Sequence, residues 1–201
     1  VIREGNFLGF HTLEVELGIK WGMGWFITSE VFFFLAFFWG FFHFRLCPNI
    51  ETGDSWPPIF ISPIMPFSIP LLNTIILLRS GIRLTWCHHS IIRGNSGRRK
   101  FGIVLTVFLG IYFTLLQLFE YTERFFCFND SLYGRIFFIA TGFHGIHVLI
   151  GTILLTVVGK RCFSSHFRNN HHIGLEISRW YWHFVDVVWL FLFCCIYWWG
   201  R

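Results

Sequence analysis

The sequence contains little charge for its length. Only 13% of its 201 residues are charged, whereas a soluble domain carries about a quarter. The charges are concentrated in a few short segments, which leaves long apolar runs between them. This pattern is typical of an integral membrane protein and argues against a large soluble core. The formal charge of +5 does not indicate nucleic-acid binding, because Trp and Phe fill the chain between the basic clusters.

The cysteines show no regular spacing. All six are scattered along the chain, and no C-x-x-C pair occurs. The sequence therefore predicts neither a disulfide framework nor a thiolate metal site, and the cysteines are expected to be small buried apolar residues. The residues ahead of the first apolar run resemble neither a secretory signal nor a transit peptide.

Five apolar runs are long enough to cross a membrane, which requires about 20 mostly apolar residues. They lie at about 17–45, 69–92, 99–121, 132–158 and 175–199. Each is predicted to be a helix, because an open strand cannot satisfy its backbone groups in lipid. The sequence therefore predicts an all-α membrane protein, with one domain over residues 1–201 built from five transmembrane helices.

Basic and acidic loops alternate along the chain. Segments 91–100 and 159–172 are rich in Arg and Lys, whereas 47–56 and 123–130 are acidic or balanced. The positive-inside rule places the basic loops in the cytoplasm or matrix. The N-terminus is therefore predicted on that side of the membrane and the C-terminus on the other.

Glu30 is a carboxylate near the middle of the first predicted span. Phenylalanines occupy the positions one and two turns away on the same helix face, namely Phe26, Phe33, Phe34 and Phe37. Charged groups at membrane depth are costly and usually face a bundle interior or a cavity. Glu30 is therefore either a proton-exchanging or lipid-contacting carboxylate, or an acid hydrogen-bonded to a neighbouring helix.

The last predicted span contains a histidine and an aspartate within the run "WYWHFVDVVWLFLFCCIYWWG". His183 and Asp186 are three residues apart and share one helix face. A histidine N–H donated to the carboxylate would satisfy both groups without water. The two residues are predicted to form a structural polar pair that helps to hold helices together. The alternative, in which His183 binds a metal ion and Asp186 accepts a hydrogen bond from its ring, is less favoured.

Other histidines could suggest a haem or metal site. They are His88, His89, His144, His147, His171 and His172. A metal site needs several converging ligands, whereas adjacent histidines on a helix point about 100° apart. His144 and His147 share a face, but small residues beside them indicate close helix packing. No metal ligand is therefore predicted.

Two further groups of polar residues lie in or near the predicted spans. Gln117, Glu120 and Glu123 form a polar line that leads out of the third span. They either line a wet cleft or cap the membrane surface, and the second is favoured. Arg79 and Arg83 lie inside the second span, one helical turn apart. They either reach toward the basic side of the membrane or meet an acidic partner.

Five segments together resemble one protein family. They are "TSEVFFFLAFFWGFFH", "PLLNTIILLRSGIRLTWCHHS", "YFTLLQLFEYTE", "ATGFHGIHVLIGT" and "WYWHFVDVVWLFLFCCIYWWG". In this order they resemble cytochrome c oxidase subunit III of the mitochondrial type. The match runs in register from "VIREGNFLGFHT" to the last residue, and several motifs of this length in one order are very specific.

The resemblance implies a fold. The family has seven transmembrane helices, a pair followed by a group of five, and this chain resembles helices three to seven. The first two helices are absent from the sequence. Either a separate polypeptide supplies them or this lineage does without them. The first is favoured, because this pair forms one side of a V-shaped, lipid-filled cleft in the family.

The resemblance also implies a function. The chain would be a core, non-catalytic subunit of respiratory complex IV in the mitochondrial inner membrane, which passes electrons from cytochrome c to oxygen and pumps protons. Haem and copper belong to partner subunits in the family, so this chain is expected to bind phospholipids and no redox cofactor. Its implied partners are mainly subunit I and the other oxidase subunits. Its implied roles are to bind phospholipid and to support proton uptake, oxygen access and the stability of subunit I.

The family's functional residues map onto five positions of this chain. Glu30 corresponds to the carboxylate of the family's S-E motif, which reacts with carbodiimides. The residues that match lipid-head-group contacts are His11, Arg161 and Arg3, and Phe26 matches an aromatic residue that lines the lipid tails. The matching head-group residues fall on the predicted basic side, where Arg can bind a phosphate through paired hydrogen bonds.

The resemblance breaks down at Arg79 and Arg83, where the family has small or neutral residues. A partner subunit with acidic residues would explain this departure.

Other functions remain open on the residues alone. The chain could belong to a related quinol oxidase as its third subunit. It could be an enzyme or carrier in which His144, His147 and His183 hold a metal, or a channel that uses Glu30 for ion passage. Iron or copper bound by the isolated chain would favour the metal protein, and conductance without partners would favour the channel.

Overall fold

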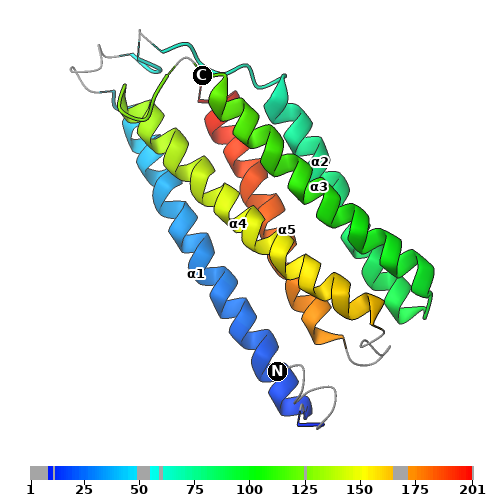
Figure 1. Cartoon of the computed structure of the whole chain (residues 1–201). Helices are drawn as coiled ribbons and strands as arrows, with labels where there is room; N and C mark the ends of the chain where they lie inside the picture. The colour runs from blue at the N-terminus through cyan, green and yellow to red at the C-terminus, as the bar shows by residue number, and fades with distance from the viewer. Residues whose placement is uncertain are drawn as a thin grey trace.

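Helices dominate the described structure. In the computed structural model, the described residues are 9–10, 12–48, 55–58, 61–124, 126–164 and 172–200. Their helices are α1 (Leu13–Leu46), α2 (Ile69–Ile92), α3 (Ser96–Thr122), α4 (Leu132–Phe163) and α5 (Ile173–Leu192), which continues into the π-helical segment η3 (Phe193–Trp198). These ranges contain no strand, and the helices lie side by side as an elongated bundle (Figure 1). The predicted all-α bundle of five helices is confirmed.

Local side-chain signals begin several of the helices. The Asn95 side chain accepts a hydrogen bond from the backbone N–H of Arg98 (3.2 Å) and caps α3. Ser131 caps α4 in the same way by accepting from the N–H of Gly134 (3.2 Å). Such caps satisfy backbone donors that have no partner inside the helix. Pro70 lies in the first turn of α2, where its missing N–H costs nothing.

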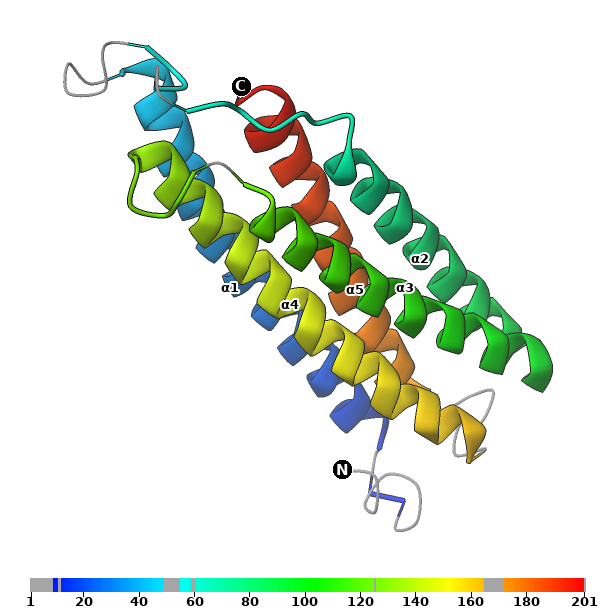
Figure 2. The same ribbon diagram turned by 45° about the horizontal axis from the view of Figure 1, so that its top comes forward.

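Helix α5 lies among the other helices. It contacts α1, α2 and α4, while α3 lies between α2 and α4 (Figure 2). Trp182 and Trp189 on α5 are fully buried. Their indole N–H groups donate to Ser80 Oγ (2.8 Å) and Thr74 Oγ1 (3.0 Å), which both belong to α2. Each tryptophan therefore buries a large apolar body while its polar group stays satisfied.

Glycines allow two helices to pack closely against Trp182. A Cβ added to Gly110 on α3 would lie 2.8 Å from the indole, and one added to Gly151 on α4 would lie 2.9 Å from it. Real Cβ atoms do not approach other heavy atoms so closely. The absence of a side chain at these two positions is therefore what brings α3 and α4 against the ring.

Helices α2 and α3 run antiparallel in a defined register. Near one end, Asn73 Nδ2 donates to Gln117 Oε1 (3.2 Å). Near the middle, Ser80 Oγ accepts a hydrogen bond from the Trp182 indole, which also packs against Gly110. Gly110 lies at the centre of α3, so the centre of α2 lies at the same level along the bundle.

Four of the described helices are long and apolar enough to cross a membrane, namely α1, α3, α4 and the continuous α5–η3 helix. Helix α2 is not among them, because Arg79 and Arg83 lower its mean hydropathy. Its 24 residues extend about 36 Å, enough for a hydrocarbon core of about 30 Å, and it runs beside α3. The single domain over residues 1–201 stays a prediction.

Helix α1 lies at the edge of the bundle and is poorly covered. Only 11% of its most apolar stretch is buried, against 56% for α5–η3. Trp21, Trp25 and Phe32 are each about two-thirds exposed. Large apolar side chains in such number require either lipid or another polypeptide as their surroundings.

The expectation that the cysteines are buried is wrong for half of them. Cys87 and Cys162 are buried, but Cys47, Cys127 and Cys194 are exposed. Cys47 and Cys127 lie beyond the ends of α1 and α3, outside the packed helix faces. Cys194 lies on the outer side of η3.

Candidate functional site

Glu30 forms a polar contact between two helices at the middle of the bundle. Its Oε2 lies 2.9 Å from Nε2 of His147. Glu30 is midway along α1 and His147 is midway along α4. The side chains of Glu30 and His147 are 23% and 11% exposed, so water reaches this contact poorly. Two roles were open for Glu30, and this geometry supports the one in which it hydrogen-bonds to a neighbouring helix.

The second ring nitrogen of His147 restricts where protons can lie. Nδ1 is 2.7 Å from the backbone carbonyl oxygen of Phe143. A carbonyl only accepts, so Nδ1 carries a hydrogen. One further proton is shared between Nε2 and Glu30: it lies either on the acid, which then donates to the ring, or on the ring, which then donates to the carboxylate. The proton can therefore move between Glu30 and His147 while their hydrogen bond is kept.

Aromatic rings surround the Glu30–His147 contact. The ring of Phe34 meets the imidazole edge to face, with centroids 5.2 Å apart, and Tyr181 stacks on it at 6.3 Å. Phe26, one turn before Glu30, stacks on the same Tyr181 at 6.3 Å. These rings limit the access of water to Glu30 and His147.

An apolar groove adjoins this site. It lies between α1 and α5, has a volume of about 440 Å³, and begins beside Glu30 at Val31 and Phe34. It extends along the two helices to Phe42 and Cys195. Only apolar side chains and one thiol line it, so it can admit an acyl chain or a small apolar molecule but offers no polar recognition.

His183 and Asp186 lie near each other, but they do not hydrogen-bond. Nδ1 of His183 is 3.7 Å from Oδ2 of Asp186, which is beyond hydrogen-bond length. The other ring nitrogen, Nε2, lies 3.2 Å from Oγ1 of Thr85 on α2. Thr85, which the sequence analysis did not single out, thus joins the predicted pair to a second helix. That the pair serves to hold helices together stays a prediction.

Gln117 and Glu120 of the predicted polar line belong to a buried network, whereas Glu123 is exposed. Glu120 pairs with Arg124, one turn away, and accepts from the hydroxyl of Tyr197 (3.5 Å). Gln117 accepts from Asn73 and donates to the same hydroxyl (3.4 Å). Glu120 is 4% exposed, so the favoured role of a cap at the membrane surface is wrong for this residue. The network joins α2, α3 and η3 at the acidic end of the bundle.

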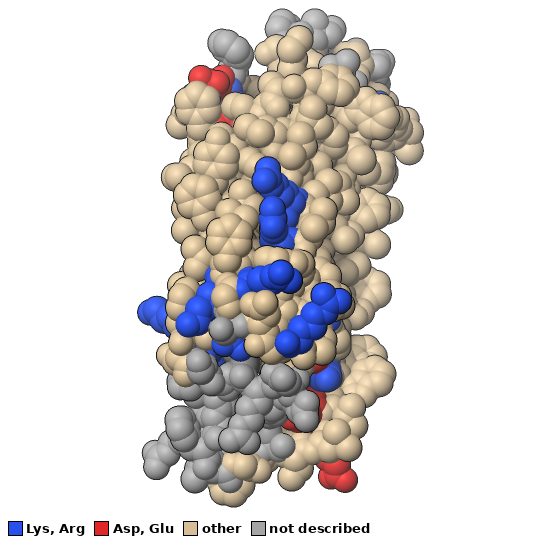
Figure 3. Space-filling model, turned by 90° about the vertical axis from the view of Figure 1, so that its right-hand side faces the viewer, with Lys and Arg blue, Asp and Glu red and all other residues tan. Residues whose placement is uncertain are grey.

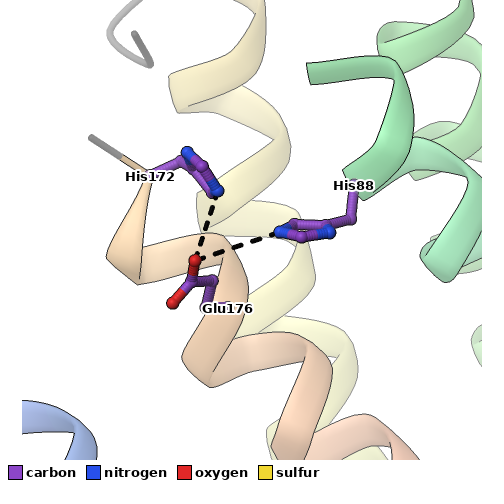
Figure 4. Close-up of side chains that lie close together, drawn as sticks. All are labelled: His88, His172 and Glu176. Carbon is purple, nitrogen blue, oxygen red and sulfur yellow. Dashed lines mark ion pairs between the residues drawn. The ribbon is translucent and has the colours of Figure 1, made fainter. Parts of the chain in front are cut away.

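A second cluster lies at the basic end. Figure 4 shows the side chains of His88 from α2 and of His172 and Glu176 from the start of α5 turned toward one another. Oε1 of Glu176 is 3.2 Å from Nε2 of His172 and 4.0 Å from Nε2 of His88. Among the described residues, these three form the only group of His, Cys, Asp and Glu side chains whose donor atoms could converge on a metal ion.

Two cations oppose metal binding at this cluster. Arg179 donates to Nδ1 of His88 (2.9 Å), which places the hydrogen of a neutral ring on Nε2, the atom that would have to bind the metal. Lys20 from α1 holds the other oxygen of Glu176 at 2.8 Å. A divalent ion would have to displace one of these cations and would be repelled by the other. The arrangement favours a charge-paired cluster that ties α1, α2 and α5 together.

The comparisons with known proteins agree with one another. The sequence profile of a family described as "Cytochrome c oxidase subunit III" matches residues 1–201, the whole chain. The chain belongs to the cytochrome c oxidase subunit III family. Proteins named cytochrome c oxidase subunit 3 are 60% identical in Pisaster ochraceus, 57% in Heterololigo bleekeri and 58% in Drosophila melanogaster. Each alignment covers the full chain and 76–77% of the relative. That a separate polypeptide supplies the first two helices of the family stays a prediction.

The residues predicted from this family lie in different parts of the chain. His11 and Arg3 fall outside the described residues. Arg161 lies in the last turn of α4, at the basic end of the bundle, while Glu30 and Phe26 lie one turn apart near the middle of α1. The structure therefore brings Glu30 and Phe26 to one place and leaves Arg161 at the end of a helix.

Sequence reasoning missed the importance of His147. It treated His144 and His147 together as residues of a packed face, but each has its own partner. His144 is buried, with Nε2 3.2 Å from the carbonyl oxygen of Val185, while His147 meets Glu30. No spacing rule could reveal the partner of His147, because Glu30 lies 117 residues away. Its place midway along an apolar span was the available signal.

Proposed function

We propose that this chain is a non-catalytic core subunit of cytochrome c oxidase that holds phospholipid along α1 and exchanges a proton at Glu30 and His147. Its subunit III family membership supports a place in the oxidase complex. The observation that carries the finer roles is the Glu30–His147 contact, which lies at the middle of the poorly covered helix α1. Subunit I is the main proposed partner, and the other oxidase subunits are further ones.

Phospholipid fits the exposed face of α1. Trp21, Trp25 and Phe26 expose rings between the basic end of α1 and its middle. Trp21 lies nine residues before Glu30, about 14 Å along the helix, which matches one leaflet of the hydrocarbon core. Lipid tails would lie against these rings. Arg161, at the same end of the bundle, supports a head-group site together with the predicted His11 and Arg3.

Proton exchange fits the Glu30–His147 contact. A single proton can lie on either side of it, and both residues keep a partner in either state. Poor access of water limits exchange with the bulk solvent. The proposed role is to support proton uptake by the catalytic neighbour and so to preserve its activity during turnover.

Oxygen access fits the apolar groove between α1 and α5. O₂ is small and apolar, so it partitions into lipid and into an apolar groove of about 440 Å³ more readily than into water.

The chain itself is proposed to bind neither haem nor copper. Its location is proposed to be the mitochondrial inner membrane, with the N-terminus on the matrix side.

The lipid role can be tested by native mass spectrometry of purified oxidase. The variant Trp25→Ala should retain fewer phospholipids per complex. The matched control is Phe119→Ala, which removes an exposed ring from α3 at the acidic end of the bundle. Equal lipid retention in the two variants would contradict the proposal.

The proton role can be tested by turnover assays on the same complex. Glu30→Gln keeps a hydrogen-bonding side chain but cannot exchange a proton at this position. It should shorten the catalytic lifetime several-fold, while Glu123→Gln at the acidic end should not. An unchanged lifetime in Glu30→Gln would rule out the proton role but not oxidase membership.

A further inference from the structure

Two arginines of α2 point away from the bundle. Arg79 is exposed and Arg83 is partly exposed, one turn apart on the outer side of the helix. No ion pair or hydrogen bond joins either guanidinium group to another described residue, and the contact recorded for Arg83 is with the ring of Trp86, at 5.9 Å. Figure 3 shows basic side chains gathered on the lower part of this face and reaching up into an otherwise apolar surface.

The register of the bundle places Arg79 at mid-depth. Its neighbour Ser80 is level with Gly110, the centre of α3, which is apolar enough to cross a membrane. Arg79 is also ten residues from the start of α2 and 13 from its end. At about 1.5 Å per residue, both distances are at least 15 Å. Arg79 therefore lies near the centre of a hydrocarbon core about 30 Å thick.

Neither membrane surface is within reach of Arg79. Arginine near a helix end can extend its side chain to the head groups. From the centre of the core the same movement would have to cover about half of the hydrocarbon thickness, which is longer than the side chain. A cation left in lipid at this depth costs several kcal/mol, and such residues normally pair with an opposite charge.

We propose that the outer face of α2 and α3 docks a transmembrane helix of another subunit, and that carboxylates of this helix pair with Arg79 and Arg83. Two acids one turn apart on the partner, about 6 Å from each other, would match the spacing of the arginines. Guanidinium groups bind carboxylates through two parallel hydrogen bonds, which strengthens and orients such a contact. Exposed Ile75, Ile82 and Phe108 supply apolar contacts for the same helix.

An anionic phospholipid fits these arginines less well than a helix does. Its phosphate would have to leave the head-group layer and enter the core by about 15 Å. A helix can present Asp or Glu at any depth, because its backbone is already satisfied. Charge complementarity at mid-depth therefore favours a polypeptide partner.

This inference rests on the proposed place of the chain in a multi-subunit oxidase, but not on lipid binding along α1. A photoreactive residue at Ile82, expressed in a host that assembles the oxidase, tests it in the intact complex. The same residue at Phe32 on α1, which is similarly exposed, is the control. Peptide mapping should identify a transmembrane segment with Asp or Glu near the crosslink at Ile82 and a different product at Phe32. Crosslinks at Ile82 that reach only lipid, or a segment without an acid, would overturn the inference.

Charge reversal tests the pairing itself. The double variant Arg79→Glu with Arg83→Glu should reduce the Ile82 crosslink at least tenfold, while Arg98→Glu at the helix end should leave it unchanged. The haem spectrum shows whether the oxidase still assembles. If the double variant prevents assembly, Arg79→Gln is used and should reduce the crosslink in assembled complex. An undiminished crosslink in assembled variant complexes would overturn the inference. Failure of the wild-type chain to copurify with haem would instead contradict the proposed function.

Discussion

A common rule for individual residues in this bundle is that polar groups inside the apolar helices have defined partners, and Arg79 and Arg83 are exceptions to it. Trp182 and Trp189 donate to hydroxyls of α2, and Glu30 shares a proton with His147. The rule follows from the cost of leaving a buried donor or acceptor without a partner, about 1–3 kcal/mol. Changes at single positions should therefore act through lost partners or lost space.

Replacement of Glu30 by alanine should destabilise the chain more than replacement by glutamine. Alanine leaves Nε2 of His147 without its partner, at a cost of about 1–3 kcal/mol. The side-chain amide introduced by Glu30→Gln can still donate to the ring, so this variant should remain near wild type in stability. Unfolding in increasing SDS concentrations measures the difference. Equal loss in the two variants would mean that the hydrogen bond does not stabilise the fold.

Gly110→Ala should destabilise the bundle by about 1–3 kcal/mol, the usual cost of overpacking. The new methyl group would meet Thr152 and lie 2.8 Å from Trp182, which is fully buried and cannot move aside. Gly145→Ala on α4 is the control, because a Cβ there meets nothing within 4 Å. Thermal unfolding in detergent compares the two variants. If Gly145→Ala is as harmful as Gly110→Ala, helix packing at Trp182 is not the cause.

At the scale of elements, α1 differs from the other helices. It is poorly buried, and its polar contacts with other described helices include Glu30 to α4 at the middle and Lys20 to Glu176 on α5 at the basic end. Aromatic contacts such as Phe33 with Phe143, at 4.9 Å, add to the attachment. The first half of α1 should therefore open more easily than any other part of a helix.

Lys20→Met should increase opening of α1 near its start. The pair with Glu176 is partly exposed, so its loss should lower stability by no more than about 1 kcal/mol. Its effect should be local, because Lys20 lies far along α1 from Glu30. Hydrogen exchange of peptides within 13–24 should accelerate, while peptides of α3 should not change. Lys100→Met is a control for removal of a basic side chain. Acceleration throughout the chain would contradict a local role.

The sequence predicted the elements well because their signals are local. Apolar length identifies the helices, and residues such as Asn95 and Ser131 mark where they begin. The site was predicted less completely, because its contacts join distant parts of the chain. Glu30 was found from its depth in an apolar run, but His147 became its partner only through the packing of α1 on α4. The i, i+4 spacing of Glu120 and Arg124 was a signal for their ion pair, but it could not reveal that Tyr197 would bury this pair.

At the scale of the whole molecule, charge is distributed by depth. The basic segments and the His88–Glu176 cluster lie at one end, and the acidic segments with the Glu120 network lie at the other. Glu30 and Arg79 lie near the middle, on different helices. This distribution is the basis for the proposed orientation, since the basic end is expected on the matrix side.

The exposed cysteines allow this orientation to be measured. Cys47 and Cys127 lie beyond the ends of α1 and α3 at the acidic end, whereas Cys87 and Cys162 are buried toward the basic end. A membrane-impermeant maleimide added to intact mitoplasts should therefore label Cys47 and Cys127 from the intermembrane-space side. Buried thiols should react only after denaturation, which makes Cys87 and Cys162 internal controls. Labelling of Cys47 and Cys127 only in inside-out vesicles would reverse the proposed topology and place the basic loops in the intermembrane space.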